Sequence, residues 1–251
     1  MRIFWRFASD SGTVTTSSTA DGYSADDLQR ANVNPVWKSE DSLTTETITI
    51  DLGSSQQIDA FALLNHNLGD VLAISGVEIE YATDSGFTTG TGTVSGVGLT
   101  SPNWYEFFGT VSRRYWRINM TKLSSSSQIE AGRVLLGSAY VPTYATRPGF
   151  TLGSGASTTR KIRTNSGSIY SSIGVAPRVL SGTLPGLDDD DYDEITTLQE
   201  TYQDGIPFVV SLNWETELAR RTVYGTLTST RPLTNVAIDK WEWQLSVREV
   251  L

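Results

Sequence analysis

The sequence predicts a mainly β protein built from two β-rich units. Three observations support this fold class. Ser, Thr, Val, Ile, Trp and Tyr, several of which favour strands, are plentiful, and 22 glycines divide the chain into short runs. Several runs alternate apolar and polar residues with a period of two, as half-buried strands do. A Gly- and Pro-containing segment at 140–160 separates two sets of such runs and indicates a domain boundary.

The first clear strand lies in the stretch ETITIDLG. Ile48 and Ile50 are expected on one face, with Thr47 and Thr49 on the other. The following Gly53-Ser54-Ser55 predicts a turn. The next run, QIDAFALLNHN, is almost continuously apolar, which predicts a strand buried on both sides or nearly so.

The next strands are GVEIEYATD and a basic, aromatic run, RRYWRINM, with a Gly/Thr-rich loop or weak hairpin between them. Interleaved Arg and aromatic residues occur in nucleic-acid grooves, but they also occur in sandwich strands. Alternation puts Trp116, Ile118 and Met120 on one face, which favours a core strand. Arg113 and Arg117 then cover strand edges or pair with acidic residues.

Composition excludes several classes of function. The net charge of −9 disfavours a nucleic-acid partner. The absence of cysteine excludes disulfides and thiolate metal sites, and a single histidine, His66, gives no basis for a His cluster or a catalytic triad. Glu78 and Glu80 share the polar face of a strand, with no sign of a convergent acid/base pair. We therefore expect no enzyme activity, catalytic residue, cofactor or metal.

Neither export nor membrane insertion is expected. Arg2 and Arg6 interrupt the apolar residues of the N-terminal stretch, so we predict no signal peptide. Nothing approaches the roughly eighteen consecutive apolar residues of a membrane-spanning helix.

Residues of the first half carry a family resemblance. Trp37 precedes an I-x-I-D-L-G strand at Ile48–Gly53, a later R-Y-x-R-I run occupies Arg114–Ile118, and an apolar strand from Val134 ends at Gly137. This ordered set, over about residues 10–140, resembles the galactose-binding-like (discoidin, or F5/8 type C) jelly roll. The resemblance implies a jelly-roll sandwich over 1–142. Unlike extracellular members, this chain has no disulfide pair at the domain ends.

The second half predicts strands around 159–164, 167–172 and 176–184, and then one helix near 189–203. Tyr192, Ile195, Leu198 and Tyr202 form one apolar helical stripe. Asp188–Asp191 suit a helix N-terminus; as an alternative, their oxygens suit Ca²⁺, although the alternating spacing of a calcium loop is missing. The runs IPFVVSLNW, RRTVYGTLTST and KWEWQLSVREVL predict three closing strands.

This order of elements over 143–251 resembles the tail-tube/distal-tail β-sandwich of tailed bacteriophages. The whole chain therefore resembles a phage or prophage minor tail or baseplate protein. That resemblance implies a homo-oligomeric ring, most often six-fold, that contacts other tail or baseplate proteins, is assembled in the bacterial host cytoplasm and resides in the virion tail. It allows a host-surface glycan as a partner. The alternative, from another class, is a free lectin-like protein in which the jelly roll binds carbohydrate.

Candidate sugar-binding residues combine flat indoles with amide and imidazole groups, which could stack on a sugar ring and hydrogen-bond its hydroxyls. For the indoles the alternative is core packing, and for the histidine it is a strand-end turn in which Asn65 and Asn67 satisfy backbone groups. The candidates are Asn34, Trp37, His66, Asn103 and Trp104.

Candidate interface residues follow from the ring hypothesis. The long aromatic strand KWEWQLSVREVL is expected to be a sheet edge, which would invite pairing with a neighbouring copy. The acidic stretch Asp188–Asp191 could then meet basic residues of that copy. The candidates are Asp189, Asp190, Arg220, Arg221, Trp241 and Trp243.

Overall fold

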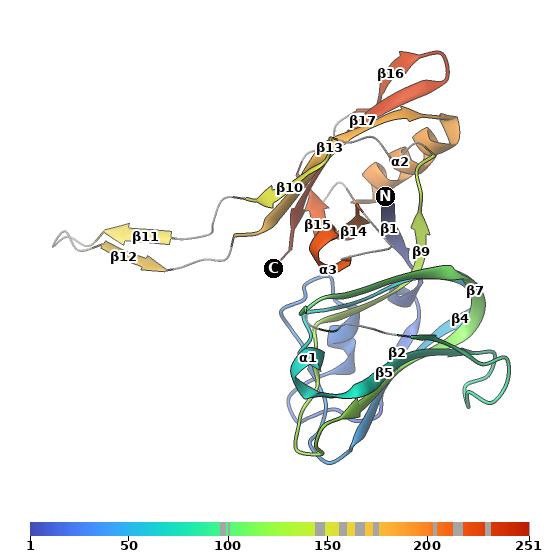
Figure 1. The fold of residues 1–251 in the computed structure, drawn as a ribbon, viewed down its shortest axis with the longest axis vertical. Helices are drawn as coiled ribbons and strands as arrows, with labels where there is room; N and C mark the ends of the chain where they lie inside the picture. Colours follow the sequence, from blue (N-terminus) through green and yellow to red (C-terminus); the bar gives the residue numbers. More distant parts are fainter. Residues whose placement is uncertain are drawn as a thin grey trace. The chain divides into compact units, whose positions relative to one another are not determined.

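Strands dominate both halves of the chain in the computed structural model, which confirms the mainly β fold class (Figure 1). The structure describes residues 1–95, 99, 101–143, 149–155, 160–163, 169–172, 176–202, 205–212, 218–228 and 232–250. Within these residues, no helix combines the length and the apolar character needed to cross a membrane.

Contacts divide the chain into two units. The N-terminal unit contains Arg2–Tyr140 and Asn213–Thr222, and the C-terminal unit contains Met1, Val141–Leu212 and Val223–Leu251. Independent folding of a fragment cut near residue 142 remains a prediction.

The N-terminal unit is organised by one large antiparallel sheet with the strand order β1-β9-β4-β7-β5-β6, and β2 also pairs with β4. A separate two-stranded sheet joins β3 to β8. The strands are β1 (Arg2–Phe7), β2 (Thr13–Thr16), β3 (Trp37–Lys38), β4 (Thr45–Leu64), β5 (Leu72–Ala82), β6 (Gly92–Ser95), β7 (Trp104–Lys122), β8 (Glu130–Ala131) and β9 (Arg133–Tyr140). Its short helices are η1 (Ala8–Asp10), η2 (Ala25–Gln29), α1 (Leu68–Val71) and α3 (Leu218–Arg221).

The long strand β4 bends where the sequence predicts a turn. Its first part pairs with β2, its second part pairs with β9, and β7 pairs with both parts. The register with β7 shifts between Asp51 and Gln56, and Gly53 has a φ of +74° there. The predicted turn at Gly53–Ser55 does not separate two strands, because β4 continues from Thr45 to Leu64 and pairs with β7 on both sides of the irregularity. Such bends let a strand pass from one layer of a sandwich to the other.

The core of this unit confirms the predicted faces of the strands. Ile48 and Ile50 of β4 are buried, as are Trp116, Ile118 and Met120 of β7. These side chains belong to one apolar cluster. The basic, aromatic run is thus a core strand, and its arginines are only partly buried.

The C-terminal unit contains a sheet with the order β10-β13-β17-β15-β14, and β16 also pairs with β17. Strands β11 and β12, predicted at 159–164 and 167–172, pair with each other in a separate sheet. The strands are β10 (Thr151–Ser154), β11 (Arg160–Arg163), β12 (Ile169–Ser172), β13 (Arg178–Leu187), β14 (Phe208–Ser211), β15 (Thr222–Leu227), β16 (Thr234–Ala237) and β17 (Lys240–Glu249).

The last strand is not a sheet edge, contrary to the sequence-based expectation. β13 pairs with β17 from Trp241 to Arg248. On the other side of β17, β16 pairs with its beginning and β15 with its end. Both sides of β17 are therefore occupied within its own unit. A free sheet edge thus gives no reason to expect association of copies through this strand.

The predicted helix is confirmed as α2 (Asp189–Tyr202). Ile195, Leu198 and Tyr202 are buried, as the apolar stripe requires. Asp188 and Asp191 cap the helix reciprocally: the Asp191 N–H donates to Asp188 Oδ1 at 2.9 Å, and the Asp188 N–H donates to Asp191 Oδ2 at 3.3 Å. These bonds satisfy N–H groups that a helix start leaves unpaired, so the acidic stretch caps the helix.

Candidate functional site

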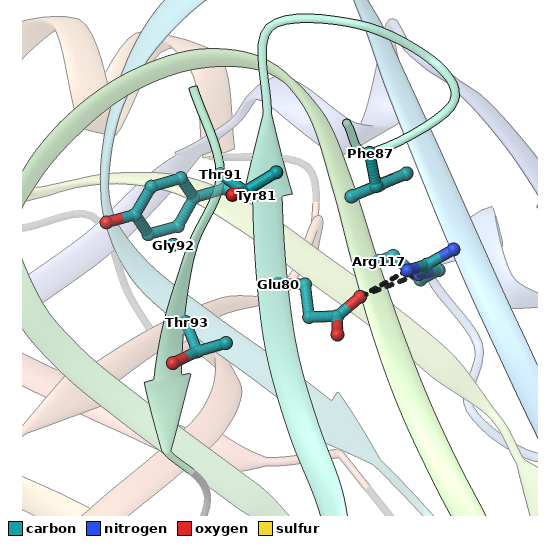
Figure 2. Close-up of a pocket in the computed structure, with 7 residues that line it drawn as sticks. All are labelled: Glu80, Tyr81, Phe87, Thr91, Gly92, Thr93 and Arg117. Atoms are coloured by element: carbon teal, nitrogen blue, oxygen red, sulfur yellow. Dashed lines mark hydrogen bonds and ion pairs between the residues drawn. The ribbon is translucent and has the colours of Figure 1, made fainter. Parts of the chain in front are cut away.

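A pocket of about 230 Å³ lies on the part of the N-terminal sheet formed by β5, β6 and β7. Figure 2 shows its lining: Glu80 and Tyr81 from β5, Phe87 and Thr91 from the β5–β6 loop, Gly92 and Thr93 from β6, and Arg117 from β7.

An ion pair forms the floor of the pocket. Glu80 and Arg117 lie directly opposite each other on the antiparallel strands β5 and β7, so their side chains share a face. Arg117 Nε donates to Glu80 Oε2 at 2.8 Å, and Nη2 donates to the same oxygen (Figure 2). Glu80 Oε1 makes no hydrogen bond to the described part of the chain. One carboxylate oxygen is therefore left to accept a hydrogen bond from a ligand.

The β5–β6 loop is held in shape by the carboxylate of Asp84. This carboxylate accepts hydrogen bonds from the N–H and the hydroxyl of both Thr88 and Thr89, and from the N–H of Gly86. The hydrogen bonds from Thr89, and then those from Thr88, hold the pKa of Asp84 well below its usual range. The loop is thus fixed by interactions that it contains itself.

Phe87 stands at the tip of this loop with a φ of +53°, a left-handed conformation that is uncommon for a bulky residue. The Arg117 guanidinium carbon lies 4.1 Å from the centre of its ring. This distance is typical of a cation–π contact. The loop therefore places an aromatic ring beside the ion pair.

Tyr81 and Gly92 form the opposite wall. They are paired across β5 and β6, and a β-carbon on Gly92 would lie 2.2 Å from the Tyr81 hydroxyl. Only glycine leaves room for the ring. Arg113 lies over Tyr81, with its guanidinium carbon 5.5 Å from the ring centre, and its Nε donates to Gly90 O at 2.7 Å. Arg113 thus closes the end of the loop.

The chemistry of the pocket suits recognition. It offers an aromatic face, a guanidinium, a carboxylate oxygen and threonine hydroxyls. One carboxylate among the described lining residues does not make the acid/base pair of a hydrolase. The described residues contain no group of three or more His, Asp or Glu side chains placed to hold a metal ion.

The two tryptophans predicted as sugar platforms lie inside the N-terminal unit. Trp37 is fully buried, and its Nε1 donates to Ser18 O at 3.1 Å. Trp104 is 4% exposed, and its Nε1 donates to Glu106 Oε1 at 2.9 Å. Their rings pack in the core, which is the alternative that the sequence left open, so neither presents a face to a ligand in the described structure.

His66 lies in a strand-end turn, again as the alternative describes. Its Nδ1 accepts the Leu68 N–H at 3.2 Å, and burial lowers its pKa to about 4. The side chains of Asn65 and Asn67 hydrogen-bond backbone groups of other segments.

Asn103, which comes just before β7, is hydrogen-bonded to this turn, because its Oδ1 accepts the Asn65 N–H at 2.9 Å. Asn34 follows Val33, whose carbonyl accepts from the Asn65 amide. The structure thus brings Asn103 and the chain around Asn34 to the turn that contains His66, and none of these residues lines the pocket.

The candidate interface residues differ in location and in burial. Asp189 Oδ1 accepts from Trp241 Nε1 at 3.1 Å, which joins α2 to β17. Trp243 is buried in its own unit, while Asp190 is exposed. The remaining candidates, Arg220 and Arg221, lie on α3 in the N-terminal unit. Their role between copies of the chain stays a prediction.

Sequence reasoning did not identify the pocket. Its main residues come from three separate segments, and pairing of β5 with β7 brings them together. The signal that was present is the stretch TDSGFTTG, in which a lone aromatic residue, Phe87, stands inside a polar turn.

Comparison with known proteins gives a family match for part of the chain. The family model described as "NedA-like, galactose-binding domain" matches residues 20–118. No curated protein matches the chain.

Solved structures similar to the chain include carbohydrate-binding modules. Chitosan-binding module 1 of a chitosanase/glucanase from Paenibacillus sp. IK-5 is 22% identical, with a TM-score of 0.44 over 53% of this chain and 100% of that one. Module 2 of the same enzyme, in complex with chitotriose, is 23% identical, with a TM-score of 0.43 over 52% and 99%. A His 62 mutant of the lectin binding domain of Lectinolysin, complexed with Lewis b, is 15% identical, with a TM-score of 0.44 over 53% and 96%.

Proposed function

We propose that the N-terminal unit binds carbohydrate and that the pocket between β5, β6 and β7 receives a sugar unit. The observation that carries this proposal is the gathering of Phe87, Glu80 and Arg117 around one pocket. Sugar rings pack their C–H faces on aromatic rings, and their hydroxyls both donate and accept hydrogen bonds. The match of residues 20–118 to a galactose-binding domain model supports the same function.

The size of the pocket favours a single sugar residue as the bound unit. Its volume of about 230 Å³ lies below the roughly 300–1,000 Å³ of sites for drug-sized ligands. Few polar groups reach the ligand, and the pocket is open, so we expect a dissociation constant on the order of 0.1–1 mM. Binding to a polymer or a cell surface would then gain strength from several copies acting together.

The test is calorimetric titration of the full chain with galactose, N-acetylglucosamine and chitotriose. Phe87→Ala should weaken the binding of the best ligand about tenfold, since it removes the aromatic face. Tyr23→Ala is the matched control, because Tyr23 is an exposed aromatic residue of the same unit outside the pocket. Absence of binding to every sugar, or equal loss in both variants, would contradict the proposal.

A second candidate function concerns the C-terminal unit. Its order of elements, β13, α2, β14, β15 and β17, is the one that resembles the phage tail-tube/distal-tail module. This order supports the proposal that the chain forms a ring in a phage tail tip or baseplate, bound to itself and to other tail proteins. In that setting the N-terminal unit would recognise a host-surface glycan.

Charge reversal on α2 tests the ring directly. Asp190 is exposed at the start of α2, in the acidic stretch that the ring hypothesis assigns to the contact with a neighbouring copy. If the ring forms, Asp190→Lys should lower the fraction of oligomer in mass photometry, with and without partner tail proteins. Glu200→Lys, an exposed change of equal charge near the other end of α2, is the control. A monomeric wild-type chain that is also absent from purified virions would exclude the structural role.

A further inference from the structure

The geometry points to a specificity for neutral sugars over acidic ones at the pocket between β5, β6 and β7. This inference rests on the proposed sugar binding. Its basis is that the cation lining the pocket, Arg117, is already paired with a carboxylate, Glu80, that lines the pocket too.

The charges of the lining cancel. Among the described lining residues, Arg117 and Glu80 are the charged ones, and the others are two aromatic residues, two threonines and a glycine. An acidic sugar that brought its carboxylate to Arg117 would place it beside the carboxylate of Glu80. Two like charges this close repel, and the guanidinium gains little from a second anion.

The other nearby guanidinium does not create an anion site. Arg113 Nε donates to Gly90 O and its Nη1 donates to Ser112 O, both at 2.7 Å, while its plane lies over Tyr81. Its hydrogen bonds are directed at the backbone. Glu78, exposed on the same face of β5 as Glu80, adds further negative potential.

The same ion pair suits two adjacent hydroxyls of a neutral sugar. Arg117 can donate to one hydroxyl oxygen, and Glu80 Oε1, which the Arg117 contacts leave unused, can accept the proton of the next. A side-by-side donor and acceptor match a vicinal diol, in which one hydroxyl accepts from Arg117 and its neighbour donates to Glu80. Phe87 then packs against the ring carrying the diol.

The experiment compares galactose with galacturonic acid, which differ in the group at C6. The wild-type chain, titrated at pH 7, should bind galactose at least about tenfold more tightly than galacturonic acid. Equal or tighter binding of galacturonic acid would overturn the inference and leave the proposed sugar binding intact. Failure of both sugars, of the matched pair glucose and glucuronic acid, and of N-acetylglucosamine and chitotriose would overturn the proposed function itself.

Glu80→Gln sharpens the test because glutamine keeps the shape and removes the charge. Arg117 is then an unpaired cation, so galacturonic acid should bind about tenfold more tightly than it does to the wild type, and this gain should fade as NaCl rises. Glu78→Gln changes the net charge equally but lies outside the pocket lining and does not contact Arg117, so it should change the ratio of the two sugars far less than Glu80→Gln does. An unchanged ratio in Glu80→Gln, measured on a variant with wild-type circular dichroism, would contradict the inference.

Discussion

Two of the ion pairs formed by strand β7 differ in how deeply they are buried and in which of their polar atoms are already hydrogen-bonded. Arg117 pairs with Glu80 of β5, and five residues further on Lys122 pairs with Glu46 of β4. The Lys122 and Glu46 side chains are fully buried, whereas those of Arg117 and Glu80 are 29% and 21% exposed. The strand therefore places one pair inside the unit and the other at a pocket.

The buried pair has its polar atoms satisfied by the protein. Lys122 Nζ donates to Glu40 O at 2.9 Å and contacts Glu46 Oε1 at 3.3 Å. The other oxygen, Glu46 Oε2, accepts from the Ser17 and Ser18 hydroxyls. At the pocket, by contrast, Glu80 Oε1 makes no hydrogen bond to the described part of the chain. The difference shows that burial inside the unit satisfies one pair completely, whereas the pair at the pocket keeps a polar atom that a ligand could reach.

The largest expected effect comes from breaking the buried pair. Lys122→Met keeps the length of the side chain but leaves the Glu46 carboxylate buried without its cation, which should lower the free energy of unfolding by about 3–5 kcal/mol. Urea denaturation measures the change. Adding Glu46→Gln removes the uncompensated charge and should recover part of the loss, while a double variant no better than Lys122→Met would contradict an electrostatic cause.

A second prediction compares a core residue of β7 with a partly exposed residue of the same strand, and its larger effect on stability is similar to that of Lys122→Met. Trp116 is 1% exposed and belongs to the core cluster, so Trp116→Ala should cost roughly 3–5 kcal/mol through the cavity it leaves. Arg113→Ala, on the pocket side of the same strand, should stay near the ±0.5 kcal/mol typical of surface changes. Equal and small effects in thermal denaturation would mean that Trp116 is not a core residue.

Another buried ionisable group, His66, forms no ion pair with the described residues, so its burial should be visible in the pH dependence of stability. Burial lowers its pKa to about 4 in the folded state, from 6.5 in the unfolded chain. Between these values the unfolded state binds more protons, so stability falls as pH falls from 6.5 towards 4, and it is fully present above 6.5. The total is on the order of 3 kcal/mol.

Replacement of His66 by glutamine isolates this contribution. The variant should lose the part of the pH dependence that lies between pH 6.5 and 5, where most carboxylates are still ionised. Urea midpoints at half-unit pH steps measure it. Identical slopes in the wild type and the variant would show that His66 ionises freely in the folded state.

The parts of the fold that follow from local pattern were predictable from the sequence. Alternation fixed the buried face around Trp116, and the stripe Ile195, Leu198 and Tyr202 located α2 within a residue or two. The sequence predicted a turn between two strands at Gly53, because a glycine before two serines is typical of a turn. The structure has one continuous strand there, because β4 pairs with β7 on both sides of Gly53. The central place of β17 also depends on partners far away in the chain.

The site was harder to predict because it depends on register. Glu80 and Arg117 meet because β5 and β7 pair in one particular alignment, and a shift of one residue would put the two side chains on opposite faces of the sheet. Phe87 depends on a loop shape set by Asp84. The indoles of Trp37 and Trp104 attracted attention by residue type, yet their positions along the strands put them in the core.

The smallest effect on stability is expected when the cation of the Arg117–Glu80 pair is replaced by methionine, as in the buried pair. Arg117→Met removes a cation from β7, as Lys122→Met does, but the remaining Glu80 carboxylate can be hydrated. The exposed pair and the contact with Phe87 together contribute about 1 kcal/mol or less, so the denaturation midpoint should hardly move. Sugar binding, however, should weaken about tenfold if the proposed function holds, because the variant lacks the Arg117 donor that the proposal assigns to the ligand. A loss of stability as large as that of Lys122→Met would show that the Arg117–Glu80 pair holds the sheet together and is not kept for recognition.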